Sequence, residues 1–265
     1  MERFEKHKGL SLRKADAAAD IKLINQYSVK ELTPDDVYCF SAILCDNDVD
    51  RDLERFTDKA LDQLAKLFVG KTGISDHRWS SEKQIARLYR VEVEETAEKN
   101  SLGEPLKQLV GSAYMLRNEH TQPIVEAIEG GIIKEVSIYC SLAKQTCSLC
   151  GEPFSMNWRT WIYECANGHV KGETYDEGLC VCELEDAQDA FEFSFVAVPA
   201  QRNAGVTKSA QDLEDAFAVL MATDLSRHTD KVKALLPHIQ SALSDAADRE
   251  VRAKILSENE KFLKK

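Results

Sequence analysis

The stretch KEVSIYCSL, residues 134–142, alternates between apolar and polar side chains. Every second residue on one face is apolar: Val136, Ile138, Cys140 and Leu142. The other face carries Ser137, Tyr139 and Ser141. A period of two is the period of a β-strand, so the stretch predicts a strand that is buried on one side. Ser137 is then either an ordinary strand serine, which is the commoner case, or a nucleophile.

Patterns on both sides of this strand predict a mixture of helices and strands. Strands are expected at residues 37–45, 84–95 and 106–116 and within 189–206, and helices at 57–70 and 121–131. In the first helix, Thr57 suits the N-cap and Gly70 suits the end. The fold class expected from these patterns is therefore mixed α+β.

The segment 189–206 resumes the main domain after a cysteine-rich stretch. One face of the expected strand is apolar: Phe191, Phe193, Phe195 and Ala197. Glu192 and Ser194 occupy the opposite face. If the cysteine-rich residues 144–188 are looped out, this strand becomes a neighbour of the Ser137 strand. Glu192 would then lie in the same sheet as Ser137.

The composition divides the chain into three zones. Residues 1–35 form a polar N-terminal segment, and residues 36–206 form the core domain, with 144–188 as an insertion. Residues 207–265 are highly charged and are expected to form a helical, acidic tail in which Ser209 caps the first helix. A length of 265 residues suits one large domain with such appendages.

Charge and hydropathy exclude several classes of protein. The formal net charge of −11 argues against a general nucleic-acid binder, which needs a cationic surface. No apolar run reaches the roughly 18 residues of a membrane span, so no membrane partner is expected. The charged N-terminus lacks the apolar centre of a signal peptide. We therefore expect a reducing cytosol, where the eight cysteines are free thiols or metal ligands rather than disulfides.

Five of the cysteines cluster in the insertion. Cys147 and Cys150 form a C-x2-C pair, and Cys165 and His169 form a C-x3-H pair after fourteen intervening residues. Two short turns that each supply two ligands are typical of tetrahedral zinc sites, and a closed set of four is structural rather than catalytic. The spacing therefore predicts a zinc ribbon, with a cluster of buried thiols as the alternative. The fourth ligand has candidates besides His169: Cys180 and Cys182.

A nucleophilic serine needs a neighbouring base, and the base needs an orienting partner. Three of the six histidines lie in the terminal or helical appendages and His169 is expected on the metal, which leaves His77 and His120. His77 follows the strand-like KTGIS, whereas His120 lies in a polar loop. Glu192 is the candidate partner of the base. Asp76 is a poor one, because neighbouring side chains on a strand point to opposite faces.

Four stretches occur in an order that resembles the prohead, or capsid maturation, serine protease family of tailed bacteriophages. They are CFSAILCDNDVDRDLERFTDKALDQLAKLFVGKTGISDH at 39–77, QIARLYRVEVEE at 84–95, IIKEVSIYCS at 132–141 and FEFSFVAVPAQRNAGVTK at 191–208. The most specific pieces are the helix followed by glycine and Asp-His, the serine in EVSI, and the closing pattern E-x-S-x-V-x-x-P-A-x-x-x-A. The cysteine-rich zone is an insertion between them.

The resemblance implies a fold related to the herpesvirus assembly proteases, with a mainly antiparallel, β-barrel-like core surrounded by helices. It makes Ser137 the nucleophile and His77 the general base. The herpesvirus enzymes use a second histidine as the third member, and no histidine stands at the matching place here. Glu192 occupies that closing strand, so the expected set is Ser137, His77 and Glu192. Arg202 lies about where those enzymes place arginines near the oxyanion, with an ordinary loop arginine as the alternative.

The resemblance also implies a serine endopeptidase that cleaves the major capsid protein or a scaffold protein, and in some members itself, during prohead maturation. It would act in the host cytoplasm inside the assembling procapsid, with structural Zn²⁺ and no catalytic cofactor; a homodimer is left open. The main alternative is a non-enzymatic head-assembly scaffold protein with a structural zinc ribbon. Two further interpretations are less favoured. One is a zinc-ribbon nucleic-acid module, which the net charge disfavours. The other is a cysteine hydrolase that uses Cys140, which is disfavoured because Cys140 lies on the apolar face.

Overall fold

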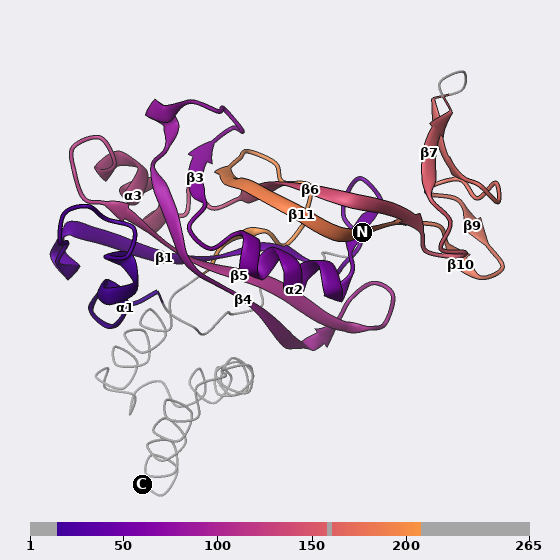
Figure 1. Ribbon diagram of the computed structural model, residues 1–265, viewed down its shortest axis with the longest axis horizontal. Helices are drawn as coiled ribbons and strands as arrows, with labels where there is room; N and C mark the ends of the chain where they lie inside the picture. Colours follow the sequence, from indigo (N-terminus) through magenta and orange to yellow (C-terminus); the bar gives the residue numbers. More distant parts are fainter. Residues whose placement is uncertain (1–14, 158–160, 208–265) are drawn as a thin grey trace, which may run out of the picture. The chain divides into compact units, whose positions relative to one another are not determined.

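The computed structural model describes residues 15–157 and 161–207, which form a mixed α+β arrangement (Figure 1). The expected helical tail lies outside these residues, apart from Thr207. The described part contains three α-helices: α1 Ala17–Ile24, α2 Asp58–Leu67 and α3 Gln122–Glu129. Two short 3₁₀ turns are η1 Pro34–Asp36 and η2 Ser81–Lys83. No helix in the described ranges is long and apolar enough to cross a lipid bilayer.

Eight strands form the main sheet: β1 Val37–Asp46, β2 Glu54–Phe56, β3 Thr72–Ser75, β4 Ala86–Lys99, β5 Pro105–Leu116, β6 Val136–Cys147, β11 Cys182–Phe195 and β12 Gly205–Val206. Their order is β12-β1-β5-β4-β3-β11-β2, and β6 pairs with β11. The sheet is mainly antiparallel, since only the pairings of β11 with β2 and β3 are parallel.

The strand pairing does not close the sheet into a barrel, so the barrel-like core expected from the resemblance is not confirmed. Closure would require a ladder between β6 and β12. In the described residues the two ends meet only at an isolated bridge, where Glu135 pairs with Gly205 just before β6 begins. A single bridge does not extend the sheet across this gap.

Helix α2 forms where the sequence predicts one. The side chain of Thr57 caps its first turn by accepting a backbone hydrogen bond. Leu61, Leu64 and Phe68 are fully buried, and the helix packs against β11. Gly70, with a φ of +83°, adopts the left-handed conformation that ends many helices. The chain then enters β3, which leads directly to His77.

Strand β11 lies in the middle of the apolar core. Phe193 is fully buried, and its ring lies 6.4 Å from that of Phe40 and 5.9 Å from that of Phe195. The residue opposite Phe193 on β3 is Gly73. A Cβ atom at this glycine would lie 2.4 Å from Cζ of the Phe193 ring. The absence of a side chain at position 73 therefore lets the Phe193 ring pack across β3.

The apolar face of β11 is shorter than the sequence pattern suggests. A β-bulge between Ala190 and Glu192 in the pairing with β6 displaces Phe191 from the buried face, and its side chain is exposed. The strand ends at Phe195, so Ala197 lies in the following loop. The predicted stripe of four residues is therefore wrong at both ends, because an alternation rule assumes an unbroken ladder.

The cysteine-rich insertion connects β6 to β11 at the far end of their ladder. The two strands stay paired as far as Cys147 and Cys182, so the segment outside the ladder is 148–181 and is shorter than the expected insertion. It carries two hairpins: β7 Phe154–Asn157 with β8 Ile162–Cys165, and β9 Thr174–Tyr175 with β10 Gly178–Leu179. Figure 1 shows both at the end of the long ladder.

Replacing Gly73 by alanine tests the close approach of β3 to Phe193. We expect Gly73→Ala to lower the free energy of unfolding by about 1–3 kcal/mol, because the new methyl group would overlap the buried Phe193 ring and approach Cβ of Ala86 to 2.9 Å. Urea denaturation measures this change. In a Phe193→Leu background the cost should be smaller, since leucine lacks the two ring atoms that the methyl group would meet. Equal costs in both backgrounds would contradict the explanation.

Candidate active site and metal centre

The turn after β3 holds His77 in an unusual backbone conformation. Asp76 and His77 both have positive φ angles, 54° and 51°, which are unfavourable for residues with a side chain. Two hydrogen bonds to β11 stabilise the turn: the Asp76 N–H donates to the Phe195 carbonyl (3.0 Å), and the His77 N–H donates to Oγ of Ser194 (2.8 Å). The histidine is therefore fixed by its backbone to the end of β11.

The His77 side chain pairs with Glu192, as expected. Nδ1 of His77 lies 2.7 Å from Oε1 of Glu192, and the Glu192 side chain is only 3% exposed, against 37% for His77. An ionised carboxylate only accepts hydrogen bonds, so Nδ1 donates and Nε2 keeps its lone pair when the ring is neutral. This arrangement orients the imidazole with a buried carboxylate and leaves the other nitrogen available as a base.

Ser137 lies on the same face of the sheet as this pair. In the β6–β11 ladder Ser137 is directly opposite Ser194, and Glu192 is directly opposite Tyr139. Residues directly opposite each other in an antiparallel ladder share one face, and so do residues two apart on a strand. Ser137 is therefore next to Ser194, whose hydroxyl binds the backbone of His77. The fold brings the three predicted residues together on one face.

The hydroxyl of Ser137 makes no hydrogen bond within residues 15–157 and 161–207, and none joins it to His77. Ser137 is half-buried. Hydrogen bonds between a nucleophile and its base are often long or poorly aligned without substrate and tighten when substrate binds. The geometry thus supplies an oriented base and a neighbouring serine, but not a formed serine–histidine contact.

The sequence pattern did not single out Ser194 as a site residue. It is completely buried and accepts the N–H of His77 while lying opposite Ser137, so it connects the base to the serine strand. The only available signal was its position two residues after Glu192, which places both on one face of a strand. Ser194 is a positioning residue, since its hydroxyl holds the backbone of the turn.

The structure does not bring Arg202 to the site through any direct contact. Arg202 is exposed in the loop between β11 and β12 and makes no hydrogen bond or ion pair in the described part of the chain. The loop itself is anchored next to Ser137: the N–H of Val196 donates to the Glu135 carbonyl (3.1 Å), and that of Val206 to the Lys134 carbonyl (2.6 Å). The expected oxyanion role of Arg202 stays a prediction.

Two other candidates are less suited to catalysis. Burial raises the pKa of the Cys140 thiol to about 12, so almost none of it is the nucleophilic thiolate at neutral pH. This disfavours a cysteine hydrolase that uses Cys140. His120 is exposed in the turn before α3, and within the described ranges its ring has no carboxylate partner. Neither residue shows the orientation by a buried group that His77 has.

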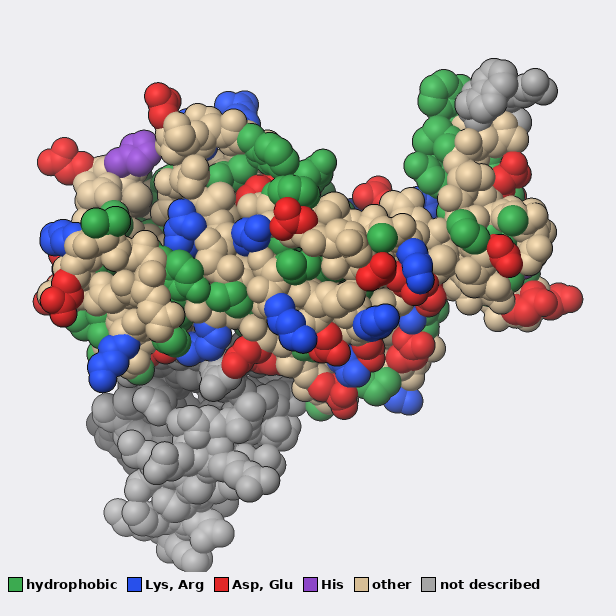
Figure 2. Space-filling model, viewed as in Figure 1, with side chains coloured by type: hydrophobic (Ala, Val, Ile, Leu, Met, Phe, Trp, Pro, Cys, Tyr) green, Lys and Arg blue, Asp and Glu red, His purple; other side chains and the backbone are tan. Residues whose placement is uncertain are grey.

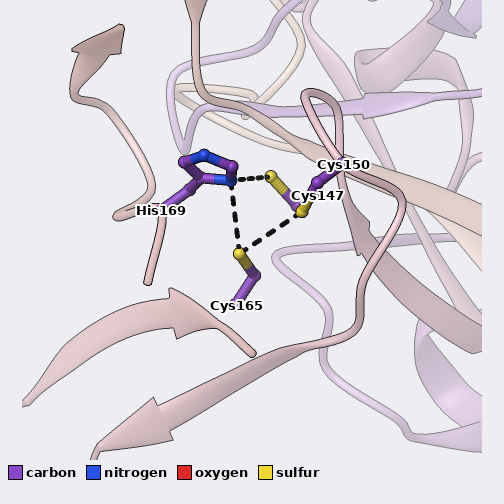
Figure 3. Close-up of side chains that lie close together, drawn as sticks. All are labelled: Cys147, Cys150, Cys165 and His169. Carbon is purple, nitrogen blue, oxygen red and sulfur yellow. Dashed lines mark hydrogen bonds between the residues drawn. The ribbon is translucent and has the colours of Figure 1, made fainter. Parts of the chain in front are cut away.

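The insertion contains a second site, made of Cys147, Cys150, Cys165 and His169 (Figure 3). Their ligand atoms all lie within 4.8 Å of one another. Three separations are 3.5–3.6 Å: Cys150 Sγ to Cys165 Sγ, and His169 Nδ1 to the Sγ atoms of Cys147 and Cys165. Ligands of one tetrahedral ion with metal–sulfur bonds of about 2.3 Å lie about 3.6–3.8 Å apart. The four residues therefore fit a single metal ion.

The structure favours His169 over both alternatives for the fourth position. Cys180 Sγ lies 3.7 Å from that of Cys147, but Cys180 is not in the group of four whose atoms all converge. Cys182 faces the backbone instead, with its Sγ 4.0 Å from the Glu183 carbonyl. None of the eight cysteines, all of which lie in the described residues, forms a disulfide. Cys180 is thus a neighbour of the site rather than a member of it.

Cysteine variants test this ligand assignment. We expect the purified chain to hold one equivalent of transition metal, and Cys165→Ser or His169→Ala to reduce it more than tenfold, because a three-ligand site binds far more weakly. Elemental analysis after dialysis measures the content. Cys182→Ser is the matched control, since Cys182 is buried in the same region, and it should keep the metal. Loss of metal in Cys182→Ser, or retention in His169→Ala, would contradict the assignment.

Comparisons with models of known protein families, with curated proteins and with solved structures found no match to this chain. A base held by a carboxylate beside a serine recurs on unrelated folds and is recognised by its geometry and roles. The candidate active site is therefore defined by the pairing of His77 with Glu192 and by the register that places Ser137 beside them.

Proposed function

We propose that this chain is a serine endopeptidase with Ser137 as nucleophile, His77 as general base and Glu192 as the group that orients the base. The observation that carries the proposal is the 2.7 Å contact between His77 Nδ1 and a carboxylate that is almost fully buried. A buried acid paired with a half-exposed histidine, on the sheet face of a half-buried serine, is the arrangement that acyl transfer needs.

The reaction would run in two steps. Oγ of Ser137 attacks the carbonyl carbon of the scissile peptide bond while Nε2 of His77 takes the hydroxyl proton. The same nitrogen returns the proton to the amine as the C–N bond breaks, leaving an acyl-enzyme. A water molecule, deprotonated by His77, then hydrolyses the ester and restores Ser137. Glu192 stabilises the imidazolium that forms in each step and keeps Nδ1 protonated.

The biological role of this activity rests on the resemblance to prohead proteases. On that basis the substrates are the major capsid protein or a scaffold protein, with self-cleavage in addition, inside the assembling procapsid in the host cytoplasm. A homodimer and the oxyanion role of Arg202 belong to the same proposal. A barrel-like core is also part of this proposal. It would need β6 and β12 to pair beyond the bridge between Glu135 and Gly205.

For the second site we propose a structural zinc ion. Three thiolates and one imidazole are the donor set that zinc prefers, and four protein ligands leave no open position for a substrate or water. The hairpins of segment 148–181 are short, so metal binding would replace the apolar core that such a small unit lacks. Zinc would therefore stabilise the insertion and take no part in catalysis.

The second candidate function is a non-enzymatic head-assembly scaffold protein. It is favoured by one observation, the lack of a hydrogen bond between Ser137 and His77 in the described residues. In that case the pair formed by His77 and Glu192 would only stabilise the turn after β3.

A fluorophosphonate probe separates the two functions without a known substrate. The probe forms a bond between phosphorus and Oγ of an activated serine and releases fluoride, and its rate depends on the base. We expect stoichiometric labelling of the wild type and none with Ser137→Ala, and we expect labelling to slow by roughly 10⁶-fold with His77→Ala and by about 10⁴-fold with Glu192→Gln. Intact mass spectrometry measures the label and its rate.

Ser141→Ala is the matched control, because Ser141 lies on the same strand and is also half-buried. It should be labelled at the wild-type rate. Intact mass of the capsid protein co-expressed with each variant then tests the substrate. If the wild type is not labelled at Ser137 and the capsid protein keeps its full mass, the peptidase function is excluded and the scaffold function is supported.

A further inference from the structure

Three aromatic side chains form an exposed cluster beside the candidate active site. Trp79, Tyr139 and Phe191 are 65%, 49% and 36% exposed. Their ring centroids are 5.3 Å apart for Trp79 and Tyr139, 5.6 Å for Trp79 and Phe191, and 5.4 Å for Tyr139 and Phe191. Figure 2 shows hydrophobic side chains gathered on the face over β6 and β11, the strands that carry Tyr139 and Phe191. A contiguous exposed aromatic group of this kind usually marks a binding site.

Each ring belongs to a segment that carries one of the proposed catalytic residues. Trp79 comes two residues after His77, and Tyr139 two residues after Ser137 on the same face of β6. Phe191 directly precedes Glu192, and Tyr139 lies opposite Glu192 in the ladder. The bulge beside Ala190 is what exposes Phe191 on this side. The cluster is therefore built from the same three segments as the active site.

A cavity of about 300 Å³ opens next to the cluster. Trp79, Phe191 and Ile74 supply apolar walls, and Gln84 is among the neutral polar residues of the lining. Glu192, the carboxylate that holds His77, also lines it, so the cavity adjoins the base. This volume is at the lower end of the range for pockets that enclose ligands, and it suits one side chain of a peptide.

The charges of the lining exclude acidic side chains and do not favour basic ones. Glu192 is the only charged residue in the lining, so nothing there would compensate an incoming carboxylate. Its oxygen Oε1 is bound by His77, and the other oxygen, Oε2, is buried without a partner and so is not open to a ligand ammonium group. What remains accessible to a ligand is mainly ring faces and apolar edges.

We propose that Trp79 and Phe191, which line the cavity, and Tyr139, which packs against both rings, form a subsite that receives a large uncharged side chain of the substrate, aliphatic or aromatic, close to the scissile bond. This inference rests on the proposed peptidase function and names its substrate class. Trp79 and Phe191 act as specificity determinants because they contact the substrate side chain, and Tyr139 supports their rings. None of the three takes part in proton transfer.

Cleavage of a synthetic peptide library with randomised positions tests the subsite. We expect the wild type to prefer leucine, methionine, phenylalanine or tyrosine over alanine by roughly 10–100-fold in kcat/KM at one fixed position relative to the cleaved bond. Trp79→Ala and Phe191→Ala should reduce this ratio to less than threefold, and Trp79→Phe should keep most of it. Mass spectrometry of the products measures the preference within each variant.

Trp161→Ala is the matched control, because Trp161 is a similarly exposed tryptophan, 77%, in the metal-binding insertion. It should leave both cleavage and preference unchanged. Cleavage with equal rates for all side chains, a preference for alanine, lysine or glutamate, or a preference that survives Trp79→Ala and Phe191→Ala would overturn the subsite alone. No cleavage together with no fluorophosphonate labelling of Ser137 would overturn the peptidase function, and the subsite with it.

Discussion

Strand β11 is paired along both edges, and this constraint determines where every residue of the candidate active site lies. On one edge it runs antiparallel to β6 from Phe195 to Cys182, and on the other it runs parallel to β2 and then β3. In that register Ser194 lies opposite Ser137 on one side and Ile74 on the other. A shift of one residue would turn the Phe193 ring toward the active-site face. The packing of Phe193 against Gly73 therefore also fixes the geometry of the candidate active site.

The candidate active site concentrates features that oppose folding. Two successive residues with positive φ angles cost on the order of 1–3 kcal/mol each, and Glu192 is buried with one oxygen unpaired. The surrounding structure offsets these costs through the bonds of the turn to Phe195 and Ser194 and through the contact of His77 with Glu192. Unfavourable local features persist where function requires them, which agrees with the catalytic role proposed for this face.

Local sequence patterns predicted the helices, the strands and the metal-ligand pairs. They could not predict features that depend on pairing between strands far apart in the chain. The cap at Thr57, the spacing of Leu61 and Leu64, and the C-x2-C and C-x3-H pairs are local signals, and each led to the observed helix or ligand group. The bulge at Ala190, the length of the β6–β11 ladder and the open sheet depend on partners far away in the chain, which alternation does not encode. The same reason explains why Trp79 and Ser194 were missed: each acquires its place only through contacts with other strands.

The candidate metal centre and the candidate active site lie at opposite ends of one ladder, and this separation limits what a bound metal ion could do. Ser137 and Cys147 are ten residues apart on β6, about 33 Å at the rise of an extended strand, so a metal ion has no direct part in the chemistry. Yet Cys147 pairs with Cys182 at the far end of the register that aligns Ser137 with Ser194. Ala143, Lys144 and Gln145 in the outer half of β6 are exposed, so apolar burial specifies the register of this stretch weakly. Closing the metal site would hold that half in place, and the insertion would thereby support the alignment of the active site from a distance.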